Sequence, residues 1–408
     1  MIATQIKFKK MKKHLSRKIV ILLLLLCSFI TNGCTETYIL QTNTFEEVLV
    51  VEATITNELK KQEIKITKTA RFEDTETKTE AQAEVYITDD SGNKYDFEEQ
   101  SEKYVSKLEF EAIPGRKYTL TINTNDGRSY KSSAEALTTV NELEEINATV
   151  DIKNGERGVA IHVNSYDPTN NSKYYRYEYE ETYKIVAPQW TREKLVVLDP
   201  RTVDRVPNSP ETEICYSTKN NTALLLASTA EQKSDRVNYL VRFISDQNYI
   251  ISHRYSILVK QYVESLAAYT FYSTLKKTSG NGSLLSQNQP GFFYGNLKSV
   301  DNTNEKIIGF FDVASVSSKR FFFNYSDLFP KEPLPPYYTE CDIESYLFCF
   351  GFGEKCKGEE LIEKIENHTL TYAYRIGPDS PFTYYLYPTP CGDCTSFSSN
   401  IKPSFWID

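Results

Sequence analysis

The sequence predicts a mainly β protein with one or two short helices and a disulfide-tied C-terminal region. Apolar and polar residues alternate in many short segments, as in strands with one buried face. The chain of 408 residues contains 29 Tyr and 22 Phe, and flat aromatic rings pack well across neighbouring strands. Five of its eight cysteines lie after residue 340, so cross-links are expected near the C-terminus.

The first 33 residues form a predicted lipoprotein signal peptide. Seven basic residues and no acidic residue precede Ile19, and an apolar run then continues to Ile30. This run is shorter than the roughly 20 residues that a helix needs to cross a bilayer. It ends in Thr31-Asn32-Gly33-Cys34, which resembles a lipobox with Thr31 in place of the preferred Leu. The alternative is an ordinary secretory signal that is cut nearby and leaves Cys34 free or disulfide-bonded.

Acylation of Cys34 would anchor the mature protein to a membrane. More than one acyl chain gives lasting attachment, because each buried methylene contributes about 0.8 kcal/mol. Residues 34–44 then form the lipidated linker, and no later apolar stretch reaches spanning length. We therefore expect a protein that is attached to the lipid surface and does not cross it.

Residues 45–140 are predicted to form an immunoglobulin-like β-sandwich. Turn sequences at residues 90–92, 114–115 and 125–127 separate short alternating segments. About seven strands in about 95 residues are typical of this architecture. The clearest segments span residues 48–56, 63–67, 83–88, 104–110 and 118–122.

Residues 141–408 are predicted to form a second, larger β-rich domain, with a Pro-, Tyr- and Cys-rich tail from about residue 330. Ser265 can cap a helix that Gly280 can end. The expected apolar face of this helix carries Leu266, Tyr269, Tyr272 and Leu275. Alternating segments predict strands at residues 158–163, 174–180, 237–244, 255–262, 307–313 and 320–325.

The charge balance argues against nucleic acids as partners. Without the leader, the chain has 40 basic and 55 acidic residues, a net charge of about −15. Such a surface repels phosphate backbones, and the sequence contains no stripe of Lys and Arg of the kind that contacts them.

Six cysteines besides Cys34 favour a disulfide framework in an exported chain. Their even number fits complete pairing in an oxidising compartment, with 15 possible pairings. The alternative is a zinc site, because the spacing of Cys391 and Cys394 suits metal ligands and Cys349 and Cys356 would complete a set of four. The six residues are Cys215, Cys341, Cys349, Cys356, Cys391 and Cys394.

No motif for catalysis, cofactor binding or metal binding was found. The sequence lacks the metalloprotease, nucleophile-elbow and phosphate-loop patterns. His162, His253 and His368 are interpreted as ordinary strand or loop residues. Glu178, Glu180 and Glu181 could face a groove and act as paired carboxylates, although alternation of Tyr and Glu on an exposed strand face explains them equally well. We therefore expect no enzyme activity and no cofactor.

Aromatic residues in the tail are the remaining candidates for ligand or partner binding. A tyrosine offers a flat apolar face and a hydrogen-bonding tip, which suits sugars and protein surfaces. The alternative is that these rings cover a hydrophobic core under the disulfide-tied tail. The candidates are Tyr337, Tyr338, Tyr384, Tyr385 and Tyr387.

Several short segments, taken together in order and spacing, resemble the family called domain of unknown function 4249. They are residues 50–56, 114–120, 126–130 and 255–262 with Ala268-Tyr269, then Gln289-Pro290-Gly291 with Gly295-Asn296, Ile308-Gly309-Phe310-Phe311, Cys391-Gly392-Asp393-Cys394, Pro403 and Phe405-Trp406. Members are Bacteroidota lipoproteins, often encoded beside TonB-dependent outer-membrane receptors. The resemblance implies an outer-membrane location and a receptor as partner. It implies no catalytic or binding residues.

These observations predict a lipid-anchored outer-membrane protein that acts as a non-enzymatic binding accessory of a TonB-dependent receptor in nutrient uptake. One alternative is an enzyme that acts on extracellular glycan or peptide. Another is a structural or adhesive module of the envelope, for which immunoglobulin-like domains are common.

Overall fold

The computed structural model describes residues 47–408, except residues 70–77, 281–294, 352–354 and 378–380. The described chain is built mainly of strands, which confirms the predicted fold class. The predicted signal peptide, Cys34, the linker 34–44 and the Gln289-Pro290-Gly291 motif lie outside the described residues. Within the described ranges, every helix is too short or too polar to cross a bilayer.

The strands fall into three groups, N-terminal, central and C-terminal; the third group also takes a hairpin from the middle of the chain. The first group is β1 (Leu49–Thr56), β2 (Glu63–Lys68), β3 (Glu84–Asp89), β4 (Lys94–Gln100), β5 (Lys103–Ser106), β6 (Lys117–Asn123), β7 (Ser129–Ser132) and β8 (Glu135–Ala136). The second is β9 (Leu143–Lys153), β10 (Glu156–Asp167), β11 (Tyr174–Val186), β14 (Ile214–Asn220), β15 (Leu225–Ser228), β16 (Asp235–Ser245), β17 (Arg254–Val263), β18 (Leu297–Ser299) and β19 (Ile307–Asn324). The third is the hairpin β12 (Glu193–Asp199) and β13 (Thr202–Pro207) with β20 (Glu344–Phe348), β21 (Leu370–Ile376) and β22 (Phe382–Pro388).

Short helices connect these strands. The α-helices are α2 (Leu266–Gly280), α3 (Tyr325–Leu328), α4 (Gly358–Glu366) and α5 (Thr389–Gly392). Three single turns of 3₁₀-helix are η1 (Pro210–Thr212), η2 (Tyr249–Ile251) and η3 (Cys394–Ser396).

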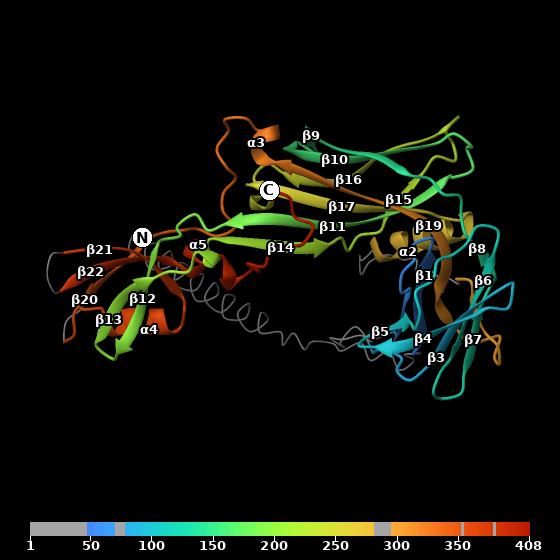
Figure 1. The fold of residues 1–408 in the computed structure, drawn as a ribbon, viewed down its shortest axis with the longest axis horizontal. Coiled ribbons are helices and arrows are strands. Elements are labelled where there is room, and N and C mark those ends of the chain that lie inside the picture. Colours follow the sequence, from blue (N-terminus) through green and yellow to red (C-terminus); the bar gives the residue numbers. More distant parts are fainter. Residues whose placement is uncertain (1–46, 70–77, 281–294, 352–354, 378–380) are drawn as a thin grey trace, which may run out of the picture. The chain divides into compact units, whose positions relative to one another are not determined.

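The long strand β19 joins the N-terminal and central strands into one sheet. Its first half pairs in parallel with β1, where Leu49 lies opposite Ile307 and Thr56 opposite Ala314. Its second half pairs antiparallel with β17. The sheet order is therefore β14-β11-β17-β19-β1-β2-β5-β4-β3-β6-β7-β18. Figure 1 shows β19 as an orange ribbon that accompanies both β17 and β1.

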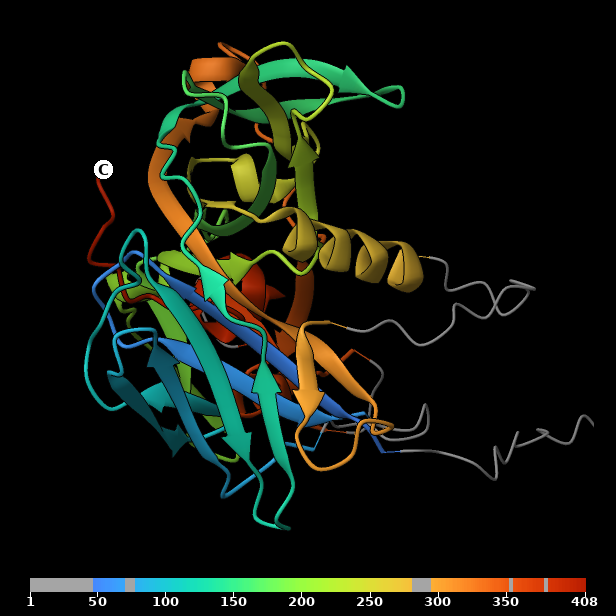
Figure 2. The same ribbon diagram turned by 90° about the vertical axis from the view of Figure 1, so that its right-hand side faces the viewer.

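The immunoglobulin-like topology predicted for residues 45–140 is not confirmed. Strands β1 to β7 lie in a single sheet path of order β1-β2-β5-β4-β3-β6-β7, and β19 and β18 extend its two ends from positions after residue 290. In Figure 2 the orange strand β18 lies beside the teal strand β7. One buried apolar cluster, which includes Ile55, Leu120 and Phe311, is shared by these early and late strands.

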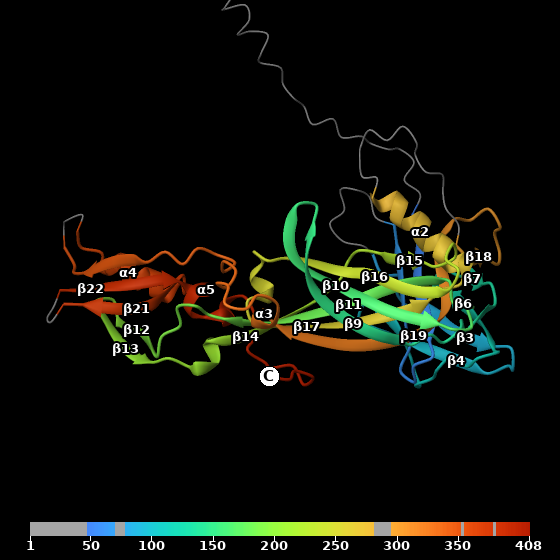
Figure 3. The ribbon, with the colours of Figure 1, turned by 90° about the horizontal axis from the view of Figure 1, so that it is seen from above.

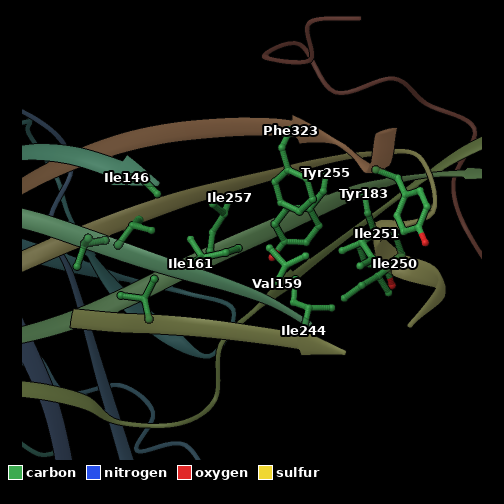
Figure 4. Close-up of a cluster of buried hydrophobic side chains, with 14 of the residues drawn as sticks. Ile146, Val159, Ile161, Tyr183, Ile244, Ile250, Ile251, Tyr255, Ile257 and Phe323 are labelled. Atoms are coloured by element: carbon green, nitrogen blue, oxygen red, sulfur yellow. The ribbon is translucent and has the colours of Figure 1, made fainter. Parts of the chain in front are cut away.

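A second core lies between the central part of this sheet and a three-stranded sheet of order β16-β10-β9. Figure 4 shows how Ile161 from β10 and Ile244 from β16 meet Ile257 from β17 and Phe323 from β19. This core explains the alternation along β11, because every second side chain of the strand points into it. Tyr175, Tyr177 and Tyr183 are all at most 1 % exposed.

The C-terminal strands form a separate three-stranded sheet of order β20-β22-β21. Helix α4 and the hairpin β12–β13 pack against it, as Figure 3 shows. The sequence analysis did not predict α4, although Leu361 and Ile365 have helical spacing and are buried. The apolar pattern of α4 is short and lies in a Pro- and Cys-rich tail, so a helix was not predicted there.

Helix α2 confirms the predicted start and part of the predicted face, since Tyr272 and Leu275 pack against the core below it. Ser265 Oγ accepts a hydrogen bond from the backbone N–H of Ala268 at 3.1 Å, as an N-cap does. Leu266, expected on the apolar face, is 60 % exposed. Ala268 and Phe271 are buried instead against Phe310 of β19. The buried face therefore differs from the predicted one mainly in the first turn, because contact with β19 determines which helix residues are covered.

Two glycines allow β19 to lie close to its neighbours. A Cβ on Gly295 would lie 1.5 Å from the carbonyl oxygen of Gly309, and a Cβ on Gly309 would lie 2.3 Å from that of Val51. Beside this contact, the Asn296 side chain accepts a hydrogen bond from Phe311 N at 2.7 Å and donates one to Phe311 O at 2.8 Å. The Gly295-Asn296 and Gly309 to Phe311 motifs thus fit each other.

Candidate functional site

A cavity of about 1000 Å³ lies on one face of the large sheet, where the N-terminal and central strands meet. Strands β1, β2, β11, β17 and the beginning of β19 supply most of its walls, and α2 adds Phe271, Tyr272 and Leu275. Its volume falls at the upper end of the range of small-molecule sites. The cavity is therefore the candidate binding site of the described chain.

The alternation of the strands places polar side chains in this cavity. In β1, Val51 and Ala53 are buried in the N-terminal core, so Glu52 and Thr54 point to the opposite face. Glu52 lies opposite Lys65 of β2 on one side and opposite Phe310 of β19 on the other. These neighbours form a wall that carries both charge and an aromatic ring.

Arg176 of β11 forms the buried end of the cavity. Its Nε donates to Glu264 Oε1 at 2.7 Å, and its Nη1 donates to Glu178. The guanidinium also lies 4.1 Å from the ring centre of Tyr262 and 5.0 Å from that of Tyr272. Burial opposes the charge, but Glu264 and the other neighbours hold the pKa of Arg176 well above its usual value. The side chain therefore stays a cation although it is only 7 % exposed.

A second carboxyl, Asp312 of β19, lies beside this ion pair. Burial and the proximity of Glu264 raise the pKa of Asp312 well above its usual value. Glu264 Oε2 and Asp312 Oδ2 have no hydrogen-bond donor while both carboxyls are ionised. A proton on Asp312 supplies the missing donor between them. Arg176 lines the cavity, whereas this carboxyl pair lies behind it.

The three glutamates singled out in β11 occupy different environments. Glu178 lines the cavity and accepts a hydrogen bond from Tyr262 Oη at 3.0 Å. Glu180 is on the same strand face and accepts from Arg320 Nη2 at 2.8 Å. Glu181 points to the opposite face, where Tyr255 Oη donates to it at 2.6 Å and Arg242 Nε at 3.0 Å. Each of these carboxylates is thus held by at least one basic side chain.

The candidate tyrosines fall into two groups that the structure does not bring together. Tyr337 packs against the central core, and its hydroxyl donates to the carbonyl of Pro390 at 3.0 Å. Tyr338 is 40 % exposed, and its ring centre lies 4.4 Å from that of Phe397.

The other three candidates, Tyr384, Tyr385 and Tyr387, lie on β22 in the C-terminal sheet. Tyr384 is 3 % exposed in the C-terminal core. Tyr385 stacks on Tyr374 with ring centres 4.5 Å apart, and Tyr387 is half-buried opposite Thr371. Tyr374 and Tyr385 therefore form a stacked pair at the surface of this sheet.

All six cysteines predicted to be cross-linked form disulfides, as expected. The pairs are Cys215–Cys394, Cys341–Cys391 and Cys349–Cys356. The four sulfurs of the alternative zinc site are therefore distributed over three disulfides and do not converge. Cys341–Cys391 and Cys215–Cys394 both cross-link the segment 391–394. The second of these bonds connects it to β14 of the large sheet.

The histidines lie away from the cavity. His162 is half-buried in β10, and His368 is exposed with a φ of +50°. His253 precedes β17, where burial and Lys184 lower its pKa. It lines a different cavity of about 440 Å³ beside Arg254 and Asn324.

Sequence reasoning missed most of the cavity residues, including Arg176, and also the carboxyls of Glu264 and Asp312 behind it. One signal was present: Asp312 is a carboxylate within the apolar segment Ile307 to Val313. A charged residue in a strand that is otherwise buried needs a partner, and this need points to a buried polar cluster. The partner itself lies in another strand and could not be identified from spacing.

Comparison with known proteins places the chain in a family. The family profile described as domain of unknown function (DUF4249) matches residues 35–320, which include β1 to β18 and most of β19. No curated protein matches the chain. Because the profile covers well over half of the sequence, the chain belongs to the DUF4249 family, as its short motifs had suggested.

Proposed function

We propose that the protein is an exported lipoprotein, held at the outer membrane by an acylated Cys34, and that it serves as a binding accessory of a TonB-dependent receptor. The observation that carries the proposal is the combination of the leader before Cys34 with complete pairing of the six later cysteines. Stable disulfides are characteristic of exported proteins, because the cytosol keeps thiols reduced.

The cavity supports binding as the main activity. It is large enough for a ligand of several rings, and one of its walls is the rigid sheet that β19 holds together. Glu178, the acid nearest its buried end, is engaged by Arg176 and Tyr262. A carboxylate with these partners is suited to holding the site in shape.

Co-purification tests the receptor partnership. The full-length protein with a C-terminal tag is extracted from native outer membranes in mild detergent, beside an unrelated lipoprotein with the same tag. We expect a TonB-dependent barrel to be recovered with this protein and not with the control. Repeated recovery of the lipoprotein without a barrel would count against the proposal.

An enzyme that acts on extracellular glycan or peptide is the second candidate function. The observation in its favour is that Glu52, Glu63 and Glu178 all line one cavity. Incubation of the purified protein with glycan and peptide mixtures, followed by mass spectrometry, distinguishes the two functions. Products that disappear in a Glu178→Gln variant would favour the enzyme, whereas binding without products supports the accessory.

A further inference from the structure

We propose that the cavity beside α2 binds an organic anion, a molecule that carries carboxylate or sulfate groups at more than one position. The inference deepens the proposed function and rests on it for its biological role, since it names the class of ligand that the accessory would hold. The binding itself follows from the lining of the cavity.

The lining is basic, whereas the chain as a whole is acidic. The full sequence has a formal net charge of −8. Three carboxylates line the cavity, those of Glu52, Glu63 and Glu178. Six basic side chains line it, those of Lys60, Lys61, Lys65, Lys103, Arg176 and Lys260. A concave surface with this excess attracts anions and concentrates them.

Some of these cations are already neutralised by neighbours. Lys60 Nζ lies 2.5 Å from Glu58 Oε2, and Lys103 Nζ lies 2.6 Å from Glu63 Oε1. Arg176 is held by Glu264 and Glu178. Lys65 lies opposite Glu52 in the strand register. These neighbours offset most of the charge of the four residues, while Lys65 has its carboxylate neighbour only in the strand register and forms no ion pair within 4.0 Å in the described ranges.

Lys61 and Lys260 remain outside these ion pairs, and the six cations exceed the five carboxylates that line the cavity or pair with its lining by one charge. Among the described residues, neither ammonium group has a carboxylate within 4.0 Å. The cross-strand neighbour of Lys260 is Glu178, which already accepts hydrogen bonds from Arg176 and Tyr262. Lys61 follows β1 and precedes β2, while Lys260 is in β17. Because β19 and β1 lie between β17 and β2 in the sheet, a ligand with anionic groups at two positions suits this pair of lysines.

The remaining walls suit the body of an organic molecule. Leu224, Phe271, Leu275, Ile308 and Phe310 contribute apolar surface, and Thr54 and Thr222 contribute hydroxyl groups. An inorganic ion would use the ammonium groups and leave this surface without contact. The cavity of about 1000 Å³ is also far larger than such an ion needs.

Calorimetry with the full lipidated protein in detergent tests the inference. The probes are trigalacturonate, which has three carboxylates, the neutral trisaccharide maltotriose, and sodium sulfate. We expect trigalacturonate to bind and maltotriose to give no heat. Sulfate should bind far more weakly than trigalacturonate. Comparable binding of maltotriose or sulfate, or no binding of trigalacturonate, would overturn the inference.

Matched variants locate the binding. Replacing Lys61→Ala or Lys260→Ala should weaken trigalacturonate binding by about tenfold each, the effect of losing one charge-assisted hydrogen bond. Lys219→Ala, an exposed lysine on β14 outside the cavity, should leave the affinity unchanged. An unchanged affinity in the Lys61→Ala/Lys260→Ala double variant would overturn the assignment.

Receptor recovery in the same preparations separates the two proposals. If trigalacturonate fails to bind while a barrel still co-purifies, the ligand class is wrong and the accessory function stands. If trigalacturonate binds and no barrel is recovered, the cavity assignment stands without the receptor.

Discussion

Arg176 and Glu264 form a buried ion pair, with Nε of the arginine 2.7 Å from Oε1 of the glutamate. The pair connects β11 to the residue that follows β17 and lies two positions before α2. The backbone N–H of Glu264 also donates to the carbonyl of Tyr174 at 2.8 Å. These contacts fix the point where the chain leaves the sheet and enters the helix over the cavity.

Because the ion pair is buried, replacing one partner should lower the free energy of unfolding more than replacing both. Arg176→Met leaves Glu264 buried without its cation, and we expect a loss of about 3–5 kcal/mol in the free energy of unfolding. Arg176→Met/Glu264→Leu removes both charges and should recover most of that loss. Urea denaturation followed by circular dichroism measures all three proteins. A double variant less stable than the single one would contradict this account.

The raised pKa of Asp312 predicts a pH-dependent stability. Above about pH 4, the folded state retains a proton on this carboxyl that the unfolded chain releases, because burial and Glu264 favour the neutral form. The contribution of Asp312 to stability is therefore present at low pH and is lost as pH rises towards its folded pKa.

Asp312→Asn should remove this dependence, because the amide donates a hydrogen bond to Glu264 without titrating. We expect the melting temperature of the variant relative to the natural protein to be higher at pH 8 than at pH 5. Asp301→Asn, an exposed substitution, serves as the control. An Asp312→Asn difference that is the same at both pH values would show that the carboxyl does not retain its proton.

Gly309 is expected to tolerate no side chain. Its φ is +151°, and a Cβ there would lie 2.3 Å from the carbonyl oxygen of Val51. Gly309→Ala should therefore cost more than the roughly 1–3 kcal/mol of backbone strain alone, because β1 and β19 must also separate. Gly127→Ala at φ +86° has no atom near the new Cβ and should cost only about 1–2 kcal/mol. Thermal denaturation of both variants gives the comparison, and equal losses would mean that the strands do not approach this closely.

The three disulfides should differ in their contribution to stability. Cys215–Cys394 spans 179 residues and Cys349–Cys356 spans 7. Because a longer loop restricts the unfolded chain more, the chain-entropy estimates are ~5 and ~2.5 kcal/mol. Guanidinium denaturation of Cys215→Ala/Cys394→Ala and Cys349→Ala/Cys356→Ala measures the difference. A larger loss of stability on removal of Cys349–Cys356 than on removal of Cys215–Cys394 would contradict this expectation.

Local features of the fold could be predicted from the sequence. Alternation located β1, β3, β6, β10, β11, β16, β17 and β19, and Ser265 marked the start of α2. An even count of cysteines after the predicted lipidation site favoured complete disulfide pairing. These features depend on neighbouring residues or on composition, which the sequence displays directly.

Features that depend on distant pairing could not be predicted. The parallel contact between β1 and β19 joins residues more than 250 positions apart, and nothing in the strand sequences names the partner. The buried side of α2 was misjudged at Leu266 because Phe310, which selects that side, lies on another strand. The cavity could not be predicted for the same reason, since its walls come from six strands and a helix.

Mass spectrometry of the N-terminal peptide, with and without globomycin, determines whether Cys34 carries the lipid anchor. In protein purified from native membranes, we expect residue 34 to be the first residue and to carry a diacylglyceryl thioether. Globomycin, which blocks lipoprotein signal peptidase, should leave the leader attached. An unmodified Cys34 in a protein that is cut elsewhere and recovered free of membranes would contradict the proposed anchor and the receptor partnership that depends on it.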